Sequence, residues 1–125
     1  GDGENIRDWL YVEDHAKALL KTLKNGNVGE KYFIGANNEK TNNQIAYQIC
    51  NLLDKLRPRA KPYKSLITYV EDRKGHDFRY SLDTSKLQDS LNWSPQYSFE
   101  KSIELTVNWY LENYDWMIKI NSKIF

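Results

Sequence analysis

The sequence predicts an α+β fold with about four helices and two or three short strands, in a single domain over residues 1–125. Four segments repeat apolar residues at the spacing of a buried helix face, whereas the apolar runs that could form strands are short. The length of the chain is that of one ordinary domain. Two or three strands need helices or another domain to cover them, so the sequence also predicts a partner surface.

The first predicted elements are an extended segment over residues 6–12 and a helix that begins at Glu13. Acidic residues at the start of this helix suit the positive end of its dipole. Apolar residues then recur at helical spacing: Ala16, Leu19, Leu20 and Leu23. The helix is expected to end at residues 25–27, where Asn-Gly-Asn favours a turn.

A buried strand over residues 31–35 and a polar loop over residues 36–40 precede the second predicted helix. Thr41 or Asn42 can cap this helix. Its apolar stripe consists of Ile45, Ile49, Leu52, Leu53 and Leu56. The helix ends before Pro58, because the residue before a proline avoids the α region.

The sequence of the second half of the chain predicts one more strand and two more helices. The strand is expected over residues 66–70. A short helix follows over residues 83–91, with Asp83 or Thr84 as its cap. Ser98 caps the last helix, which carries Ile103, Val107, Tyr110, Leu111 and Tyr114 along one face.

Charge and composition exclude several classes of function. The net charge of +1 provides no positive field for nucleic acid. No apolar run approaches the ~20 residues that span a bilayer, and no signal-peptide pattern opens the chain. Because Cys50 is the single cysteine, an intrachain disulfide and a cysteine-rich zinc site are both excluded. We expect a cytoplasmic protein that binds no metal.

Motifs for covalent or redox chemistry are absent from the sequence. There is no glycine-rich dinucleotide fingerprint, no G-x-S-x-G and no P-loop. The Tyr-x-x-x-Lys at Tyr97 and Lys101 follows no Ser/Thr-bearing strand, and we interpret it as a coincidence. We therefore predict no catalytic residue. The chain begins at Gly1 and has Met117 as its only methionine, which we interpret as part of a longer protein.

Three polar segments are candidate binding sites. The chain has five arginines and thirteen lysines, so lysine is its usual cation. An arginine in such a chain, here Arg7, favours a bidentate contact with phosphate or carboxylate over a salt bridge to Asp8 or Glu4. Residues 71–80 place several cations around a glycine. This pattern is typical of a phosphate-binding site, but it also occurs in a charged loop that is merely solvated. Residues 35–42 offer backbone N–H groups to an anion, or form an ordinary capped loop.

These motifs together resemble the dTDP-glucose 4,6-dehydratases, NAD-dependent nucleotide-sugar enzymes of the extended short-chain dehydrogenase group. The matching runs begin with Asn-Ile-Arg-Asp-Trp-Leu-Tyr-Val-Glu-Asp-His at residues 5–15. They continue in the same order with Tyr-Phe-Ile-Gly at 32–35, Asn-Glu-Lys-Thr-Asn at 38–42, Asp-Arg-Lys-Gly-His-Asp at 72–77, Arg-Tyr at 79–80, Leu-Asn-Trp-Ser-Pro at 91–95 and Trp-Tyr at 109–110. The resemblance extends from Gly1 to about Trp116.

The resemblance implies a lyase of deoxysugar biosynthesis. Such enzymes oxidise the sugar C4 with bound NAD+, eliminate water across C5 and C6, and return the hydride to C6. This chain would be the C-terminal, substrate-binding part of a Rossmann-type α/β enzyme. The N-terminal NAD-binding half with the catalytic Tyr-x-x-x-Lys would be absent, so the chain alone would be inactive. A homodimer is a further expectation.

The resemblance also implies the residues that bind the nucleotide sugar. Arg7 and Arg73 would take the diphosphate, and Asn42 would bond the nucleotide end. Gly75 would let its loop approach the ligand. The remaining matching positions of that loop are Asp72, Lys74 and His76. Lys74 replaces a usual proline and Phe78 a usual arginine, which loosens the loop and removes one cation.

Three alternatives stay open from the sequence. One is a free-standing module that holds a nucleotide sugar or joins a separate Rossmann half. Another is a degenerate remnant that folds and binds nothing, although Arg7, Asn42, Arg73 and His76 are retained. The third is a different sugar dehydratase or an epimerase. An upstream glycine-rich motif in the same reading frame would argue against the free-standing module.

Overall fold

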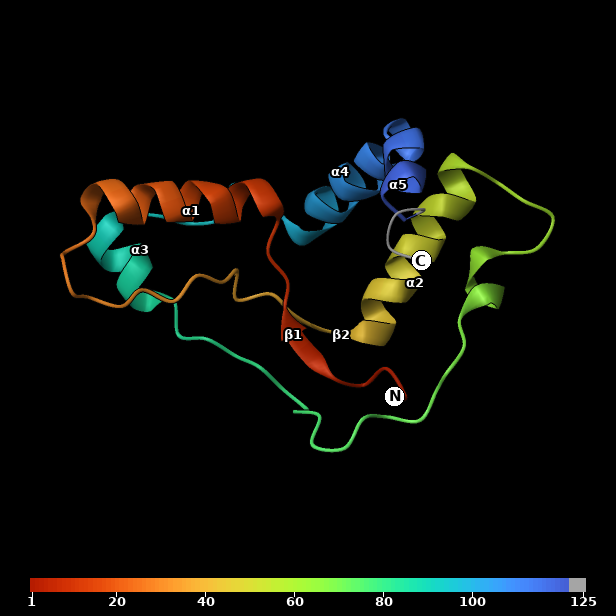
Figure 1. The fold of residues 1–125 in the computed structure, drawn as a ribbon, viewed down its shortest axis with the longest axis horizontal. Coiled ribbons are helices and arrows are strands. Elements are labelled where there is room, and N and C mark those ends of the chain that lie inside the picture. The colour runs from red at the N-terminus through yellow and green to blue at the C-terminus, as the bar shows by residue number, and fades with distance from the viewer. Residues whose placement is uncertain (122–125) are drawn as a thin grey trace.

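The computed structural model describes residues 1–121 and has five α-helices, one 3-10 helix and two short strands over that range (Figure 1). In chain order these are β1 (Ile6–Asp8), α1 (Val12–Asn25), β2 (Glu39–Thr41), α2 (Asn42–Leu56), η1 (Tyr63–Leu66), α3 (Ser85–Leu91), α4 (Phe99–Glu112) and α5 (Tyr114–Asn121). The α+β class predicted from the sequence is confirmed. None of these helices is long and apolar enough to cross a membrane.

The two strands form a small antiparallel sheet between two groups of helices. Arg7 is paired with Lys40 in its register. A third segment joins β1 through a parallel bridge between Ile6 and Arg79. In Figure 1, α1 and α3 lie to one side of the strands, and α2, α4 and α5 lie to the other.

The helices begin close to their predicted caps. Thr41 caps α2 in a capping box with Gln44, and Ser98 accepts a hydrogen bond from the Lys101 N–H at the start of α4. Asp83 accepts from the N–H of Ser85 ahead of α3. These caps lie a few residues from the groups that they satisfy, so local sequence was enough to predict them.

The predicted end of the last helix is wrong. The sequence places Tyr114 on the same helix as Val107, but α4 ends at Glu112 and α5 begins at Tyr114. Asn113 separates them, and its side chain donates to the Trp109 carbonyl at 2.8 Å. A short polar side chain that competes for a helix carbonyl favours such an interruption.

Both predicted strands outside residues 6–12 are also wrong. Residues 31–35 form no regular element and pair with no described strand, and the observed β2 lies at Glu39–Thr41, mostly within the predicted loop. Residues 66–70 follow the 3-10 turn of η1 and likewise pair with no strand in residues 1–121. A strand depends on a partner, and apolar content does not provide one.

The buried hydrophobic side chains of the described residues fall into two groups, one on each side of the sheet. Ala18, Leu87, Leu91 and Trp93 join α1 to α3, with Leu10, Tyr32 and Ile34 packed against them. Ile45, Ile103 and Val107 are buried on α2 and α4, which contact each other. The apolar stripe predicted on the first helix instead faces solvent, with Leu23 82% exposed.

Candidate functional site

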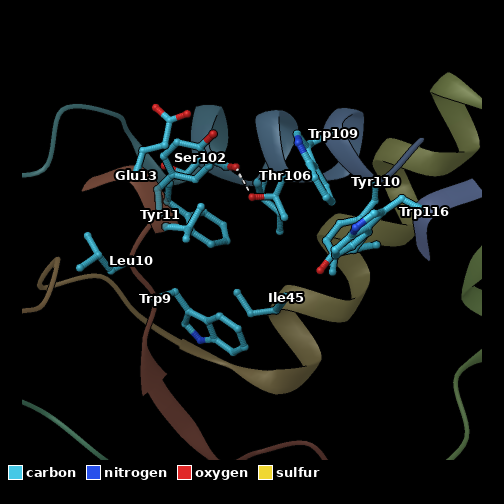
Figure 2. A pocket seen from close by; sticks show the side chains of 14 residues that line it. Trp9, Leu10, Tyr11, Glu13, Ile45, Ser102, Thr106, Trp109, Tyr110 and Trp116 are labelled. Carbon is cyan, nitrogen blue, oxygen red and sulfur yellow. Dashed lines mark hydrogen bonds between the residues drawn. The ribbon is translucent and has the colours of Figure 1, made fainter. Parts of the chain in front are cut away.

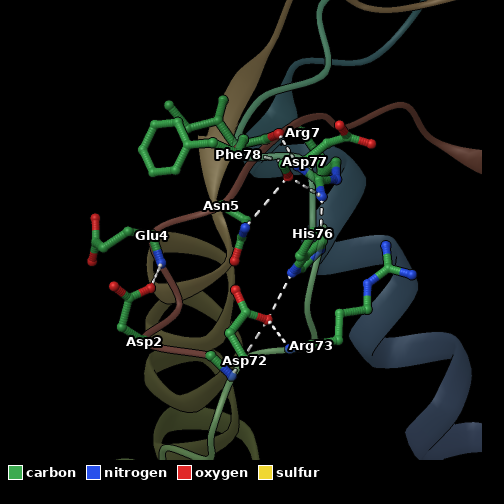
Figure 3. A network of polar contacts seen from close by, with 11 residues as sticks. Asp2, Glu4, Asn5, Arg7, Asp72, Arg73, His76, Asp77 and Phe78 are labelled. Carbon is green, nitrogen blue, oxygen red and sulfur yellow. Dashed lines mark hydrogen bonds and ion pairs between the residues drawn. The ribbon is translucent and has the colours of Figure 1, made fainter.

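The charged loop after η1 lies along the edge of β1. The N–H of Ile6 donates to the Phe78 carbonyl at 2.8 Å, and the Tyr80 N–H donates to the Ile6 carbonyl at 3.2 Å. The buried side chain of Asn5 donates to the Asp77 carbonyl. These bonds join segments about seventy residues apart in the sequence and bring residues 72–78 beside Arg7 (Figure 3).

The half-buried Arg7 uses both terminal nitrogens of its guanidinium within the chain. It donates to the carbonyls of Ile6 (2.6 Å), Phe78 (3.3 Å) and Asp77 (2.9 Å), and to the imidazole of His76 (2.9 Å). Its guanidinium also lies 4.5 Å from the centre of the Tyr80 ring. The alternative considered for Arg7, a salt bridge to Glu4 or Asp8, is not present in the described structure, where both terminal nitrogens donate to other groups.

His76 lies between Arg7 and Asp72. Arginine has no acceptor, so Nε2 of His76 accepts from Arg7 and Nδ1 carries the hydrogen that it donates to Asp72 at 2.8 Å. The hydrogen bond from His76 lowers the pKa of Asp72. Asp72, His76 and Arg7 therefore form one continuous chain of hydrogen bonds.

A second carboxylate, Asp77, contributes to the surroundings of Arg7 through the ring of Tyr80. The Tyr80 hydroxyl donates to Asp77, and this hydrogen bond raises the pKa of Tyr80. The Tyr80 ring is thereby fixed against the guanidinium of Arg7, where a cation is attracted to the face of the ring.

The other predicted residues of this loop are exposed. The Arg73 side chain points away from the Asp72–His76 pair in Figure 3, and its guanidinium bonds to no residue within 1–121. Lys74 is also exposed. Gly75 has a φ of +71°, a conformation that side chains with a Cβ rarely adopt. The structure brings Arg7, Asp72 and His76 into contact and leaves Arg73 and Lys74 open to solvent.

Asn42 lies apart from that contact network, at the first position of α2. Its backbone N–H donates to the Asn5 carbonyl at 3.1 Å, and its side chain is exposed. The next two N–H groups of the helix donate to Gly3 and to Thr41. These N–H groups are therefore not free to bind an anion.

The sequence left open whether residues 35–42 bind an anion or form an ordinary capped loop, and the structure places the carboxylate of Asp8 there. Its carboxylate accepts from the backbone N–H groups of Ala36 (2.8 Å), Asn37 (3.2 Å) and Asn38 (2.7 Å). A Cβ at Gly35 would overlap the same carboxylate. The anion in this loop is thus an internal side chain, which the sequence analysis did not identify although Asp8 lies within the motif.

An aromatic pocket of about 570 Å³ lies between the start of α1 and helices α2, α4 and α5 (Figure 2). Trp9, Tyr11, Ile45, Trp109, Tyr110 and Trp116 are among the residues that line it. The sequence analysis missed this pocket. The aromatic residues near both ends of the chain were its signal, but their proximity depends on the tertiary structure.

The described residues offer no metal centre. No group of three His, Cys, Asp or Glu side chains in residues 1–121 is arranged to hold an ion. His76 is committed to Asp72 and Arg7.

Comparison with known proteins identifies the family. Residues 1–106 match the family described as GDP-mannose 4,6 dehydratase. The chain belongs to this family. Within the GDP-mannose 4,6 dehydratase family, it is 50% identical over 122 residues to the dTDP-glucose 4,6-dehydratase of Escherichia coli, a match that covers 98% of this chain and 34% of that protein.

Solved structures agree with this assignment to the dehydratase family. A dTDP-glucose 4,6-dehydratase from Bacillus anthracis in complex with NAD has a TM-score of 0.81 at 45% identity, and covers 93% of this chain. DesIV, the Streptomyces venezuelae dTDP-glucose 4,6-dehydratase with NAD and TYD bound, has a TM-score of 0.78 at 41% identity, again over 93% of this chain. This chain covers 34% of each of those structures. The resemblance to dTDP-glucose 4,6-dehydratases is confirmed, and the chain spans about a third of the length of these relatives.

Proposed function

We propose that this chain is the nucleotide-sugar-binding part of a dTDP-glucose 4,6-dehydratase. That enzyme would convert dTDP-glucose to its 4-keto-6-deoxy product by eliminating water, with NAD oxidising and then reducing the sugar. The observation that carries the proposal is the 50% identity to the Escherichia coli enzyme over 98% of this chain. The positions Arg7, Asn42 and 72–76, which the resemblance assigns to the substrate, all lie within that aligned span.

The arginines of the site would take the diphosphate in different ways. Arg73 has an exposed guanidinium that is not bonded within residues 1–121, so it can bind a phosphate in the bidentate geometry that arginine favours. For a bidentate contact, Arg7 must first exchange one of its internal acceptors, because both of its terminal nitrogens already donate and only its Nε–H has no partner within residues 1–121. The exposed Lys74 would add a positive charge beside Arg73, and Asn42 would bond the nucleotide end.

The residues of this chain do not fit NAD. A dinucleotide site needs glycines that allow the pyrophosphate to approach the backbone after a strand. Gly35 is the glycine at the end of the segment predicted as a strand, and the space in front of it contains the Asp8 carboxylate. We therefore assign NAD to another part of the same enzyme and derive no step through it from this chain, which we expect to be inactive by itself.

The NAD-binding part would cover the exposed side of α1. Ala16, Leu19, Leu20 and Leu23 of the predicted stripe face solvent. Residues 31–35 form no regular element, and none of their backbone N–H groups donates to a described residue. A further sheet with its own strands would cover both the apolar helix face and this unpaired segment. The two thirds of the relatives' length outside this match are enough for such a domain.

Titration calorimetry with dTDP-glucose tests the proposal. We expect binding to this chain that weakens about tenfold or more in Arg73→Ala, since a charge-assisted hydrogen bond contributes about 1.5–3 kcal/mol. Arg57→Ala is the matched control, because Arg57 is an exposed arginine at the far end of α2. Equal weakening in both variants would contradict the assignment of Arg73.

The same titration has a second arm with the NAD-binding part of a homologous dehydratase added. Binding that appears only in this mixture would show that both parts complete the site. Absence of binding in both arms would overturn the proposed function. Turnover of dTDP-glucose by this chain alone would contradict the assignment of the chemistry to another part.

A further inference from the structure

Arg7 is bound by one acceptor that can titrate and three that cannot. The carbonyls of Ile6, Asp77 and Phe78 accept hydrogen bonds at every pH. The fourth acceptor is Nε2 of His76, at 2.9 Å, and an imidazole nitrogen loses its lone pair when it is protonated. The hydrogen bond between Arg7 and His76 is therefore the one bond of this set that a proton can break.

Asp72 determines which imidazole nitrogen accepts. Its Oδ1 lies 2.8 Å from Nδ1 of His76, which places the hydrogen on Nδ1 and the lone pair on Nε2. The opposite tautomer would place two donors face to face between His76 and Arg7. A carboxylate on one nitrogen of a histidine commonly determines the tautomer in this way.

We propose that His76 and Asp72 are positioning residues for Arg7, and that binding of a diphosphate at Arg7 is coupled to uptake of one proton by His76. This inference rests on the proposed function and adds a mechanism of anion capture to it. The proton comes from solvent and binds Nε2. The Arg7–His76 hydrogen bond then breaks, and the freed N–H of Arg7 becomes available to a phosphate oxygen.

The charges around His76 make this exchange favourable only when an anion is present. Among the described residues, Asp72 and Arg7 are the charged groups within hydrogen-bonding distance of His76. The Asp77 carboxylate accepts the hydrogen bond of the Tyr80 hydroxyl. Protonation adds a second cation beside Arg7. The resulting repulsion is relieved by Asp72 on one side and by a bound diphosphate on the other.

Nuclear magnetic resonance of the ligand-free chain tests the positioning role separately from any ligand. Long-range nitrogen–proton spectra at pH 8 should show His76 with its hydrogen on Nδ1. We expect Asp72→Ala to lose that preference, and Glu71→Ala, an exposed neighbouring acid, to retain it. The guanidinium resonances of Arg7 should shift as His76 is protonated. The proposal would be overturned by a hydrogen on Nε2 in the unchanged chain, or by Arg7 resonances that do not shift when His76 is protonated.

The pH dependence of dTDP-glucose binding tests the proton uptake. The pyrophosphate diester of this ligand does not titrate between pH 6 and 8, so a proton taken up there belongs to the protein. Uptake of one proton on binding changes the affinity by up to about tenfold per pH unit. The affinity should therefore rise roughly tenfold from pH 8 to pH 6, and His76→Gln should reduce that rise to less than about twofold.

His15→Gln is the control, because it removes the other histidine of the chain at an exposed position of α1. It should keep the tenfold rise. Binding that occurs with the same affinity at both pH values would overturn the proton coupling while supporting the proposed function. Absence of binding at every pH would count against the proposed function and the coupling, and the spectra of the ligand-free chain would still decide the positioning role.

Discussion

Two carboxylates hold loops in place through backbone N–H groups, and neither contacts a cation of the candidate site. Asp8 binds three consecutive N–H groups of the loop before β2. Asp14 is 1% exposed and accepts from the N–H groups of Gln96 and Tyr97, which leads the chain into α4. Since these N–H groups have no other acceptor in the described chain, each carboxylate stabilises the structure through bonds that water would otherwise make.

Replacing Asp14 with alanine should therefore destabilise the chain. We expect the free energy of unfolding to fall by about 2–3 kcal/mol, because two partly buried N–H groups lose their acceptor. Urea denaturation measures this change. Asp89→Ala is the control, since Asp89 is exposed on α3 and should change the stability by less than about 0.5 kcal/mol. An equal loss in both variants would contradict the anchoring role of Asp14.

Glu39 gives the stability a dependence on pH. Hydrogen bonds from Arg79 and then from Ser81 lower the pKa of Glu39 to about 2, below its value of about 4.3 in an unfolded chain. The folded state therefore favours the ionised form. The stabilisation is complete above the unfolded pKa and is lost as the pH falls toward 2.

The unchanged chain and the Glu39→Gln variant should therefore have the same stability at low pH. Urea denaturation at pH 6 should show the unchanged chain as the more stable, and the difference should shrink steadily between pH 5 and pH 2.5. Glu112→Gln replaces an exposed glutamate that bonds to no described side chain, so it should show no such trend. A difference for Glu39→Gln that does not vary with pH would contradict the contribution of the Arg79 pair.

At the scale of whole elements, the helices and the extended segment that contains β1 could be predicted from the sequence, whereas β2 could not. The start of α2 depends on Thr41 and Gln44, three residues apart. The pairing of β1 depends on Thr41 and on Arg79, which are far from Ile6 in the sequence. Periodicity and capping are local properties, whereas a strand exists only where another segment of the fold supplies its hydrogen bonds.

Residue types in the sequence pointed to members of the candidate site, but the hydrogen bonds between those members could not be predicted. The scarcity of arginine drew attention to Arg7, and the charged loop drew attention to His76. That these two side chains bond each other depends on the loop lying along β1, which no local pattern encodes. The anion binding expected of residues 35–42 is satisfied by Asp8 for the same reason.

Residues 31–35 should exchange their amide hydrogens rapidly. Their N–H groups donate to no described residue, whereas those within α2 are bonded along the helix. Hydrogen exchange followed by mass spectrometry should give residues 31–35 rates within about tenfold of an unstructured peptide, and much slower rates for α2. Protection of residues 31–35 equal to that of α2 in this chain alone would contradict the assignment of an unpaired segment.

The molecule as a whole combines a small core with a large exposed apolar surface. Among the described residues, seven hydrophobic side chains are buried, in two groups separated by the sheet. Leu19, Leu20 and Leu23 are each more than half exposed on α1. Exposed stripes of this kind favour association with another surface, and in the isolated chain the available surface is a second copy.

Leu23→Lys should reduce that self-association. Leu23 is 82% exposed, so its replacement should change the free energy of unfolding by less than about 0.5 kcal/mol. Sedimentation velocity over a range of concentrations should show a smaller associated fraction than in the unchanged chain. Thr68→Lys adds the same charge at an exposed residue away from α1 and should leave the association unchanged. Equal effects of the two variants would mean that net charge, and not the stripe, governs association.

The contact between Asp8 and Gly35 also has an evolutionary consequence. Any side chain at position 35 would overlap the Asp8 carboxylate, and a shorter residue at position 8 would leave three N–H groups without an acceptor. A change at one position is thus tolerated only together with a change at the other. Across related sequences, positions 8 and 35 should covary, and designed libraries should mutate them as a pair.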